Sequence, residues 1–220
     1  GLSKEYATGW SFGVGEVLSF IVPKLYGGIS PMYWGPMSFT QTSMYVGIII
    51  LFLAILSAVF VRKKLVLALG IGSLLAIFLS FGKEFPLLYD IFFKYLPGFN
   101  KFRVPAMILI LVQFSWVVMA GFGLDYIVKN RDNKKMFGFL KYSLYAAIAF
   151  FIIFLIGKKI FAGMPFIRAD ELQQYQPAQI AYLKELRLDL LIKSGIQSFV
   201  VLILATLSII AFLSKKINKY

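Results

Sequence analysis

The sequence predicts an all-α membrane protein, a polytopic bundle of transmembrane helices with interfacial amphipathic helices in its outer loops. Three observations predict this class. Hydrophobic residues make up 60% of the 220 residues, and the mean hydropathy is +0.80. Charged residues make up only 15%, whereas soluble domains carry about a quarter. Five long apolar stretches come close to or exceed the roughly 20 residues that a helix needs to cross a bilayer.

The five apolar stretches are expected to form a transmembrane bundle over residues 43–213. The predicted spans are residues 43–61, 65–81, 105–128, 137–157 and 195–213. In the second span, Gly70, Gly72 and Ser73 are small residues that would let a neighbouring helix approach closely. No internal repeat interrupts this pattern.

The remaining segments are predicted to be loops. Residues 1–42 contain many Gly and Pro residues and no full span, so we expect an outer loop with a short interfacial or re-entrant helix. Residues 82–104 and 158–194 are expected to be outer loops that each contain an amphipathic helix, beginning at Pro86 and Pro177. The second of these helices carries an apolar stripe with charged residues interspersed, which predicts a solvated or interfacial strut. The stripe is Ile180, Leu183, Leu186 and Leu190, and the charged residues are Lys184, Glu185, Arg187 and Asp189.

Lys and Arg residues are densest in the short segments 62–64, 129–136 and 214–220. The positive-inside rule weights short loops most heavily, so these segments are expected to be cytoplasmic. The N-terminal loop and the two other long loops then face outside. Residues 214–220 are expected to form a basic cytoplasmic end.

The chain contains no Cys and no His. This excludes disulfides, thiolate nucleophiles, Ser–His–Asp triads and the common His or Cys metal sites. A divalent cation would need oxygen ligands, and the sequence does not identify a cofactor. The net charge of +13 predicts contact with the lipid bilayer and with phosphates. Nucleic acid is not an expected partner, because the basic residues lie between apolar spans and form no continuous stripe.

The carboxylates are all placed away from the middle of the predicted spans. They are Glu5, Glu16, Glu84, Asp90, Asp125, Asp132, Asp170, Glu171, Glu185 and Asp189. Ionisable groups inside a membrane mark ion and proton pathways. Their absence from the spans argues against an ion-coupled transporter.

The clearest polar cluster is the stretch 100–105, which contains Lys101, Arg103 and Pro105. A residue before Pro is expected to be extended, which would place Arg103 at the outer interface beside the positive end of the third span. Such an arrangement suits a phosphate or pyrophosphate, with Lys101 and Lys83 as further candidate ligands. The alternative is ordinary anchoring, in which Arg103 reaches a lipid phosphate.

Glu16 is the acid in the apolar part of the first loop. It is a candidate catalytic or metal-holding carboxylate. Alternatively, it caps a helix and pairs with Lys24. Similarly, Lys83 and Glu84 could form a plain interfacial ion pair, which contributes little to stability.

An ordered series of stretches resembles the YfhO-like bacterial membrane proteins, in the form found in Bacteroidetes-type bacteria. The stretches are YATGWSFGVGE (6–16), VPKLYGG (22–28), YWG (33–35), YVG (45–47), FGKEFP (81–86) and NKFR (100–103). The resemblance is good over about residues 5–130, and the remaining residues resemble the family only in their hydropathy. This family is regarded as similar to GT-C glycosyltransferases.

The resemblance implies a bacterial inner-membrane protein that glycosylates envelope polymers with a polyprenyl-phosphate-linked sugar. In that superfamily the catalytic acid usually lies in the first outer loop, near the N-terminus of the whole protein. The chain resembles the middle of the family, so it is expected to be an internal fragment whose catalytic acid, and the rest of its chain, lie elsewhere. Two alternatives stay open: a non-catalytic transporter or flippase for a lipid-linked precursor, and a scaffold subunit of an envelope complex.

Overall fold

The computed structural model describes residues 3–37, 40, 44–101 and 103–214, so Ser214 alone represents the predicted basic end 214–220. Every regular element in these residues is helical, and the predicted all-α fold class is confirmed. The α-helices are α1 (Lys4–Ala7), α2 (Ile48–Phe60), α3 (Lys64–Ser80), α4 (Pro86–Tyr95), α5 (Leu109–Lys129), α6 (Lys134–Leu155), α7 (Gly157–Phe161), α8 (Glu171–Gln174) and α9 (Pro177–Leu213). Three 3₁₀ helices accompany them: η1 (Val14–Phe20), η2 (Phe99–Lys101) and η3 (Pro105–Ile108).

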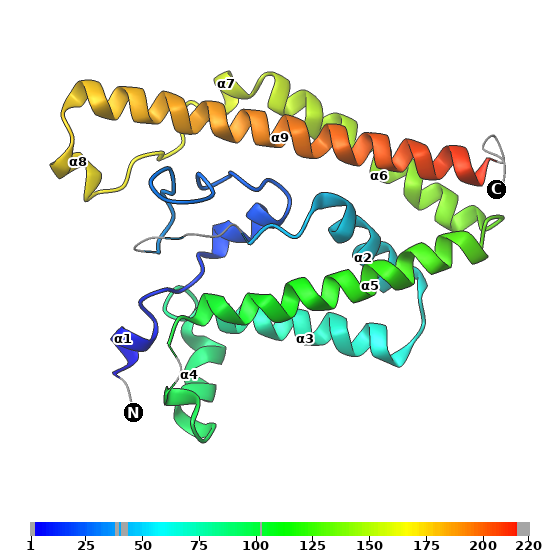
Figure 1. Ribbon diagram of the computed structural model, residues 1–220, viewed down its shortest axis with the longest axis horizontal. Coiled ribbons are helices and arrows are strands. Elements are labelled where there is room, and N and C mark those ends of the chain that lie inside the picture. Colours follow the sequence, from blue (N-terminus) through cyan, green and yellow to red (C-terminus); the bar gives the residue numbers. More distant parts are fainter. Residues whose placement is uncertain (1–2, 38–39, 41–43, 102, 215–220) are drawn as a thin grey trace.

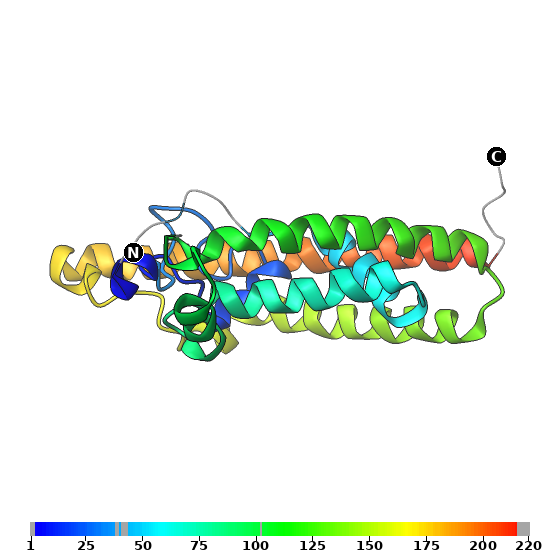
Figure 2. The same ribbon diagram turned by 90° about the horizontal axis from the view of Figure 1, so that it is seen from below.

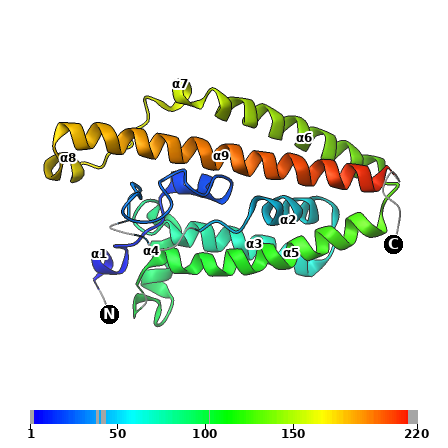
Figure 3. The ribbon, with the colours of Figure 1, turned by 45° about the horizontal axis from the view of Figure 1, so that its top comes forward.

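The long helices form two layers (Figure 1). In one layer α6 and α9 lie side by side, and in the other α2 and α3 both pack on α5. The helices α1, α4 and α8 lie at one end of the bundle, which we call the polar end (Figures 1 and 2). The linkers 61–63 and 130–133 and the last turn of α9 lie at the opposite end, which we call the basic end. At the polar end, part of the chain that precedes α2 lies between the two layers (Figure 3).

Among the described residues, three helices are long and apolar enough to cross a membrane: Pro105–Lys129, Lys134–Leu155 and Pro177–Leu213. The apolar helices α2 and α3 are shorter, with 13 and 17 residues. Large hydrophobic side chains point outward from this bundle; for example, Leu67, Ile110 and Phe114 are each about two-thirds exposed. Apolar surface on this scale is unfavourable in water. The chain is therefore a membrane protein, and a lipid bilayer is its environment.

The first apolar helix starts later than the predicted boundary at residue 43. Residue 43 lies outside the described residues, and α2 begins at Ile48. Gly47 precedes it with a φ of 104°, a left-handed backbone conformation that a glycine adopts without strain but that cannot continue an α-helix. The helix therefore cannot extend backward through Gly47.

The amphipathic helix predicted in the loop 158–194 and the predicted span 195–213 form one continuous helix, α9, with no boundary between residues 194 and 195. The 37 residues of α9 form one uninterrupted helix, which begins with Pro177 in its first turn and a hydrogen bond from Gln176 N–H to Gln179 Oε1 (3.0 Å). Its length is about 55 Å, compared with about 30 Å for the hydrocarbon core of a bilayer. The N-terminal part of α9 therefore extends beyond the apolar part of the bundle toward the polar end (Figure 1).

Glycines permit close helix packing at two places that differ from the predicted one. A Cβ on Gly123 of α5 would lie 2.3 Å from the backbone oxygen of Leu53 in α2. A Cβ on Gly195 of α9 would lie 2.2 Å from the ring of Phe154 in α6. By contrast, a Cβ on Gly72 would meet nothing within 4 Å. Of the three small residues of the second span, only Gly72 faces open space, because a Cβ on Gly70 would lie 3.9 Å from Met119 of α5 and Ser73 is buried.

Candidate functional site

Three stretches that are far apart in the sequence meet at the polar end. Residues 7–12 run between the end of α3 and the start of η3, and backbone groups and the Ser11 hydroxyl of this segment form hydrogen bonds to both sides. The hydrogen bonds are Phe12 N–H to Ser80 O (2.8 Å), Lys83 N–H to Ser11 Oγ (3.0 Å), Val104 N–H to Ala7 O (3.2 Å) and Ala106 N–H to Trp10 O (3.3 Å). The segments around residues 10, 82 and 104 therefore form one junction.

Arg103 lies at this junction, immediately before the helical turn that leads into α5. Its guanidinium donates a hydrogen bond to the Tyr6 hydroxyl and lies 5.7 Å from the centre of the Tyr6 ring. Arg103 itself is exposed, so its remaining N–H groups can reach a ligand. Its neighbour Phe102 lies outside the described residues.

The backbone beside Arg103 differs from the predicted extended form. Val104 has φ 64° and ψ 71°, which is the left-handed region. This region is unfavourable for a β-branched residue and persists only when its surroundings enforce it. The hydrogen bond to Ala7 and the buried ring of Pro105 supply that constraint. Arg103 is thus positioned by a strained turn, not by the extended residue that was expected before Pro105.

Arg103 lies on the wall of a groove of about 390 Å³ between α4, η2 and the start of α5. The other lining residues are almost all apolar: Leu79, Tyr89, Phe99, Val104, Pro105, Met107, Ile108, Ile110 and Leu111. Among the described residues that line the groove, Arg103 is the charged one. An apolar groove with a single guanidinium fits an amphiphile that has a hydrocarbon chain and an anionic head.

The two other predicted phosphate ligands are not part of this groove. Lys101 ends η2 and is exposed. Lys83 is also exposed, and it is its backbone N–H that bonds to Ser11 at the junction. Neither lysine lines the groove. The structure therefore places Arg103 at a concave apolar site and leaves Lys83 and Lys101 on the surface of the same end.

Glu16 is buried, and the structure gives it the capping role that was one of its two interpretations. Its Oε2 accepts a hydrogen bond from Gly13 N–H (2.8 Å) at the start of η1, and the Tyr33 hydroxyl also donates to its carboxylate. Within the described part of the chain, the ion pairs do not include Glu16, so the expected pairing with Lys24 is not found. Burial raises the pKa of Glu16, and the two hydrogen bonds oppose this rise.

The space around Glu16 is too small for a sugar. Glu16, Tyr26, Tyr33 and mostly apolar neighbours enclose a cavity of about 20 Å³, which matches a single water molecule. Nor do the described residues contain a group of three or more Asp, Glu, His or Cys side chains that could hold a metal ion. Glu16 does not line the groove of Arg103. Its geometry suits a carboxyl group that organises the loop around it.

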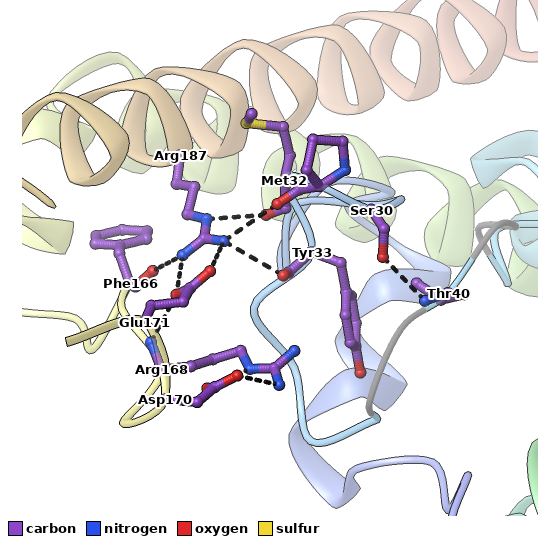
Figure 4. Close-up of polar contacts among 10 residues, drawn as sticks. Ser30, Met32, Tyr33, Thr40, Phe166, Arg168, Asp170, Glu171 and Arg187 are labelled. Carbon is purple, nitrogen blue, oxygen red and sulfur yellow. Dashed lines mark hydrogen bonds and ion pairs between the residues drawn. The ribbon is translucent and has the colours of Figure 1, made fainter. Parts of the chain in front are cut away.

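A buried ion pair that the sequence pattern does not predict lies at the polar end (Figure 4). Arg187 of α9 is fully buried, and its guanidinium forms two parallel hydrogen bonds to Glu171, Nη1 to Oε2 at 2.7 Å and Nη2 to Oε1 at 2.6 Å. It also donates to backbone oxygens of two loops. These are Phe166 O (2.7 Å), Met32 O (3.0 Å), Pro31 O (3.4 Å) and Tyr33 O (3.4 Å). The expectation that Arg187 belongs to a solvated or interfacial face is therefore wrong.

The network around Arg187 is structural, because every N–H of the guanidinium has a protein acceptor. It connects α9 to the loop at residues 31–33 and to the loop at 166–171. Burial would raise the pKa of Glu171, but the hydrogen bonds from Arg187 and from Arg168 N–H outweigh it and lower the pKa. Glu171 is thus held ionised beside Arg187.

A weak signal in the sequence could have indicated this burial. Arg187 lies four residues before Leu191 and seven before Ser194, and all three are buried on one face of α9. The predicted stripe at 180, 183, 186 and 190 is only half-buried. The buried face is therefore shifted by one residue relative to the predicted stripe.

The fold and the site define an all-α membrane protein with an apolar, arginine-bearing groove at one end. Comparison with known proteins found no matching family model, no matching curated protein and no matching solved structure.

Proposed function

We propose that this chain is part of a membrane-embedded glycosyltransferase-like protein that acts on polyprenyl-phosphate-linked sugars during glycosylation of envelope polymers. In this proposal the chain resides in the bacterial inner membrane. Its task is to bind the phosphate and the first isoprene units of the lipid-linked substrate at the groove of Arg103.

The observation that carries the proposal is the chemical character of this groove. A polyprenyl phosphate has a long hydrocarbon chain and a compact anionic head. The groove offers apolar walls along the start of α5 and one exposed guanidinium above them. Arg is the side chain best suited to bind a phosphate through two parallel hydrogen bonds.

The junction at the polar end adds support. Three of the stretches that resemble YfhO-like proteins contribute to it, namely residues 6–16, 81–86 and 100–103. Stretches that are separate in the sequence but adjacent in the fold are expected where several segments build one binding site. This adjacency agrees with a functional role for the polar end.

The proposal does not take the catalytic base from Glu16. An inverting transfer needs a carboxylate that reaches the acceptor hydroxyl. Glu16 is buried, hydrogen-bonded and outside the groove. The base would be another carboxylate of the protein. Because no described carboxylate lines the groove, a non-catalytic carrier of a lipid-linked precursor is the second candidate function.

The test compares the affinity of variants for a short-chain polyprenyl phosphate in detergent. Arg103→Lys keeps the charge but loses the paired hydrogen bonds, so binding should weaken about tenfold. Arg103→Ala should weaken binding further. Transferase activity of the intact protein, measured with the same variants, separates the two functions, because only an enzyme would show turnover.

Lys94→Ala is the matched control, since Lys94 is an exposed cation of the polar end that does not line the groove. It should bind the polyprenyl phosphate as the wild type does. Wild-type affinity in a folded Arg103→Ala protein would show that the phosphate site is elsewhere and that Arg103 is an interfacial anchor.

We further propose that the basic end is cytoplasmic and that the N-terminal loop faces outside. Dense basic linkers favour the cytoplasmic side. Because the native chain has no Cys, single cysteines at positions 63 and 175 can be labelled separately. An impermeant thiol reagent on intact spheroplasts should label position 175 and leave position 63 unlabelled. The reverse pattern would invert the orientation.

A further inference from the structure

A second groove runs along α3 from the basic end and shares no lining residue with the groove of Arg103. Both α2 and α3 pack on α5 but make little contact with each other, and the gap between them forms a groove of about 530 Å³. Its walls and floor include Ala54, Ala58, Leu67, Ile71, Trp116 and Met119. This volume is in the usual range for small-ligand sites.

Three consecutive basic residues line one end of this groove. Arg62, Lys63 and Lys64 connect α2 to α3, and all three are exposed. Lys63 Nζ lies 4.6 Å from the centre of the Phe122 ring, which holds this cation beside α5. None of the ion pairs among the described residues involves these three side chains, and no carboxylate lines the groove. The groove is thus apolar along its length and cationic at one end.

We propose that this groove binds an anionic phospholipid, with an acyl chain between α2 and α3 and the headgroup phosphate at Arg62, Lys63 and Lys64. The surrounding surface supports this occupant, because lining residues such as Leu67 and Ile71 are at least half exposed on apolar helices. Bilayer lipids cover such surface, and basic residues next to a membrane helix select anionic headgroups. The proposal does not depend on the function of the polar end.

A second copy of the chain fits the groove less well. A two-fold contact through this surface would bring its basic segment close to the same segment of the partner. Like charges in an interface disfavour association. The charge of the groove therefore favours an anionic amphiphile over self-association.

The test titrates the detergent-solubilised chain with phosphatidylglycerol or phosphatidylcholine carrying dibrominated acyl chains, which quench nearby tryptophans. Trp116 lines the groove and reports on an acyl chain bound there. Phosphatidylglycerol should quench at a concentration at least about tenfold lower than phosphatidylcholine. Trp116→Phe should remove the part of the quenching that is specific to phosphatidylglycerol.

Two lysine pairs provide a matched comparison. Lys63→Gln/Lys64→Gln should lose about tenfold in apparent affinity for phosphatidylglycerol. Lys134→Gln/Lys135→Gln removes the same amount of charge from the start of α6, which lies at the same end of the bundle but outside the groove. This control should change the apparent affinity for phosphatidylglycerol less than about twofold. Equal losses for both pairs would overturn the proposal, because they would indicate general charge attraction and not a site.

A second pair of variants tests the apolar part of the groove without altering charge. Ala58 is exposed and lines the groove, whereas Ala68 is exposed on α3 and does not. Ala58→Phe should block phosphatidylglycerol-specific quenching, and Ala68→Phe should preserve it. Equal quenching of the wild type by the two lipids, or a dimer that forms in place of lipid binding, would show that the groove has another occupant.

Discussion

Arg187→Met is expected to lower the free energy of unfolding by about 3–5 kcal/mol, because it leaves the Glu171 carboxylate buried without its partner. The same change removes the donors for backbone oxygens of two loops, which would then be buried without hydrogen bonds. Lys184→Met is the control, since Lys184 lies one turn earlier on α9 and is exposed. It should change stability by no more than about 0.5 kcal/mol. The free energies of unfolding of both variants can be measured in mixed detergent micelles.

The contribution of this ion pair should depend on pH in a defined direction. The pKa of Glu171 is lowered in the folded chain relative to the ordinary value of a glutamate. Its stabilisation is therefore complete above the ordinary pKa and is lost as the pH falls through the folded pKa. The stability difference between wild type and Arg187→Met should shrink in acid. A difference that is small and constant at all pH values would show that Arg187 is not buried against Glu171.

Gly123→Leu is expected to destabilise the bundle by about 3 kcal/mol, since even a Cβ at this position would collide with the main chain of α2. A backbone oxygen cannot move aside as a flexible side chain can, so α2 and α5 would have to separate. Gly121→Leu is the matched control on the same helix, because a Cβ on Gly121 meets nothing within 4 Å. The melting temperature in detergent should fall for the first variant and stay close to wild type for the second. Equal melting temperatures would show that α2 does not pack against Gly123.

The helices could be predicted from the sequence because hydropathy and length are properties of single segments. The apolar stretches, the amphipathic helix that begins at Pro86 and the basic linkers all follow from local patterns of residues. Gly47 shows the limit of this approach. Its sequence neighbours are apolar and compatible with a helix, but its left-handed backbone conformation prevents the helix from starting before Ile48.

The candidate sites were less predictable, because their residues come from distant segments. Arg103 could be selected from its neighbours Lys101 and Pro105, but the groove beside it depends on α4 and η2 packing near the start of α5. The burial of Arg187 depends on Glu171 and on the backbone of residues 31–33, more than 150 positions earlier. A periodic stripe on α9 alone carries no information about these partners.

Because α9 is one unbroken helix, it connects the two ends of the molecule without a hinge. Glycine is a common place for a helix to bend, but the Phe154 ring fills the space beside Gly195 and supports the helix there. A displacement of the loops that Arg187 holds would therefore not be absorbed midway along α9. We therefore expect such a displacement to tilt α9 as a whole and, through the contact of Gly195 with Phe154, to shift α6 as well.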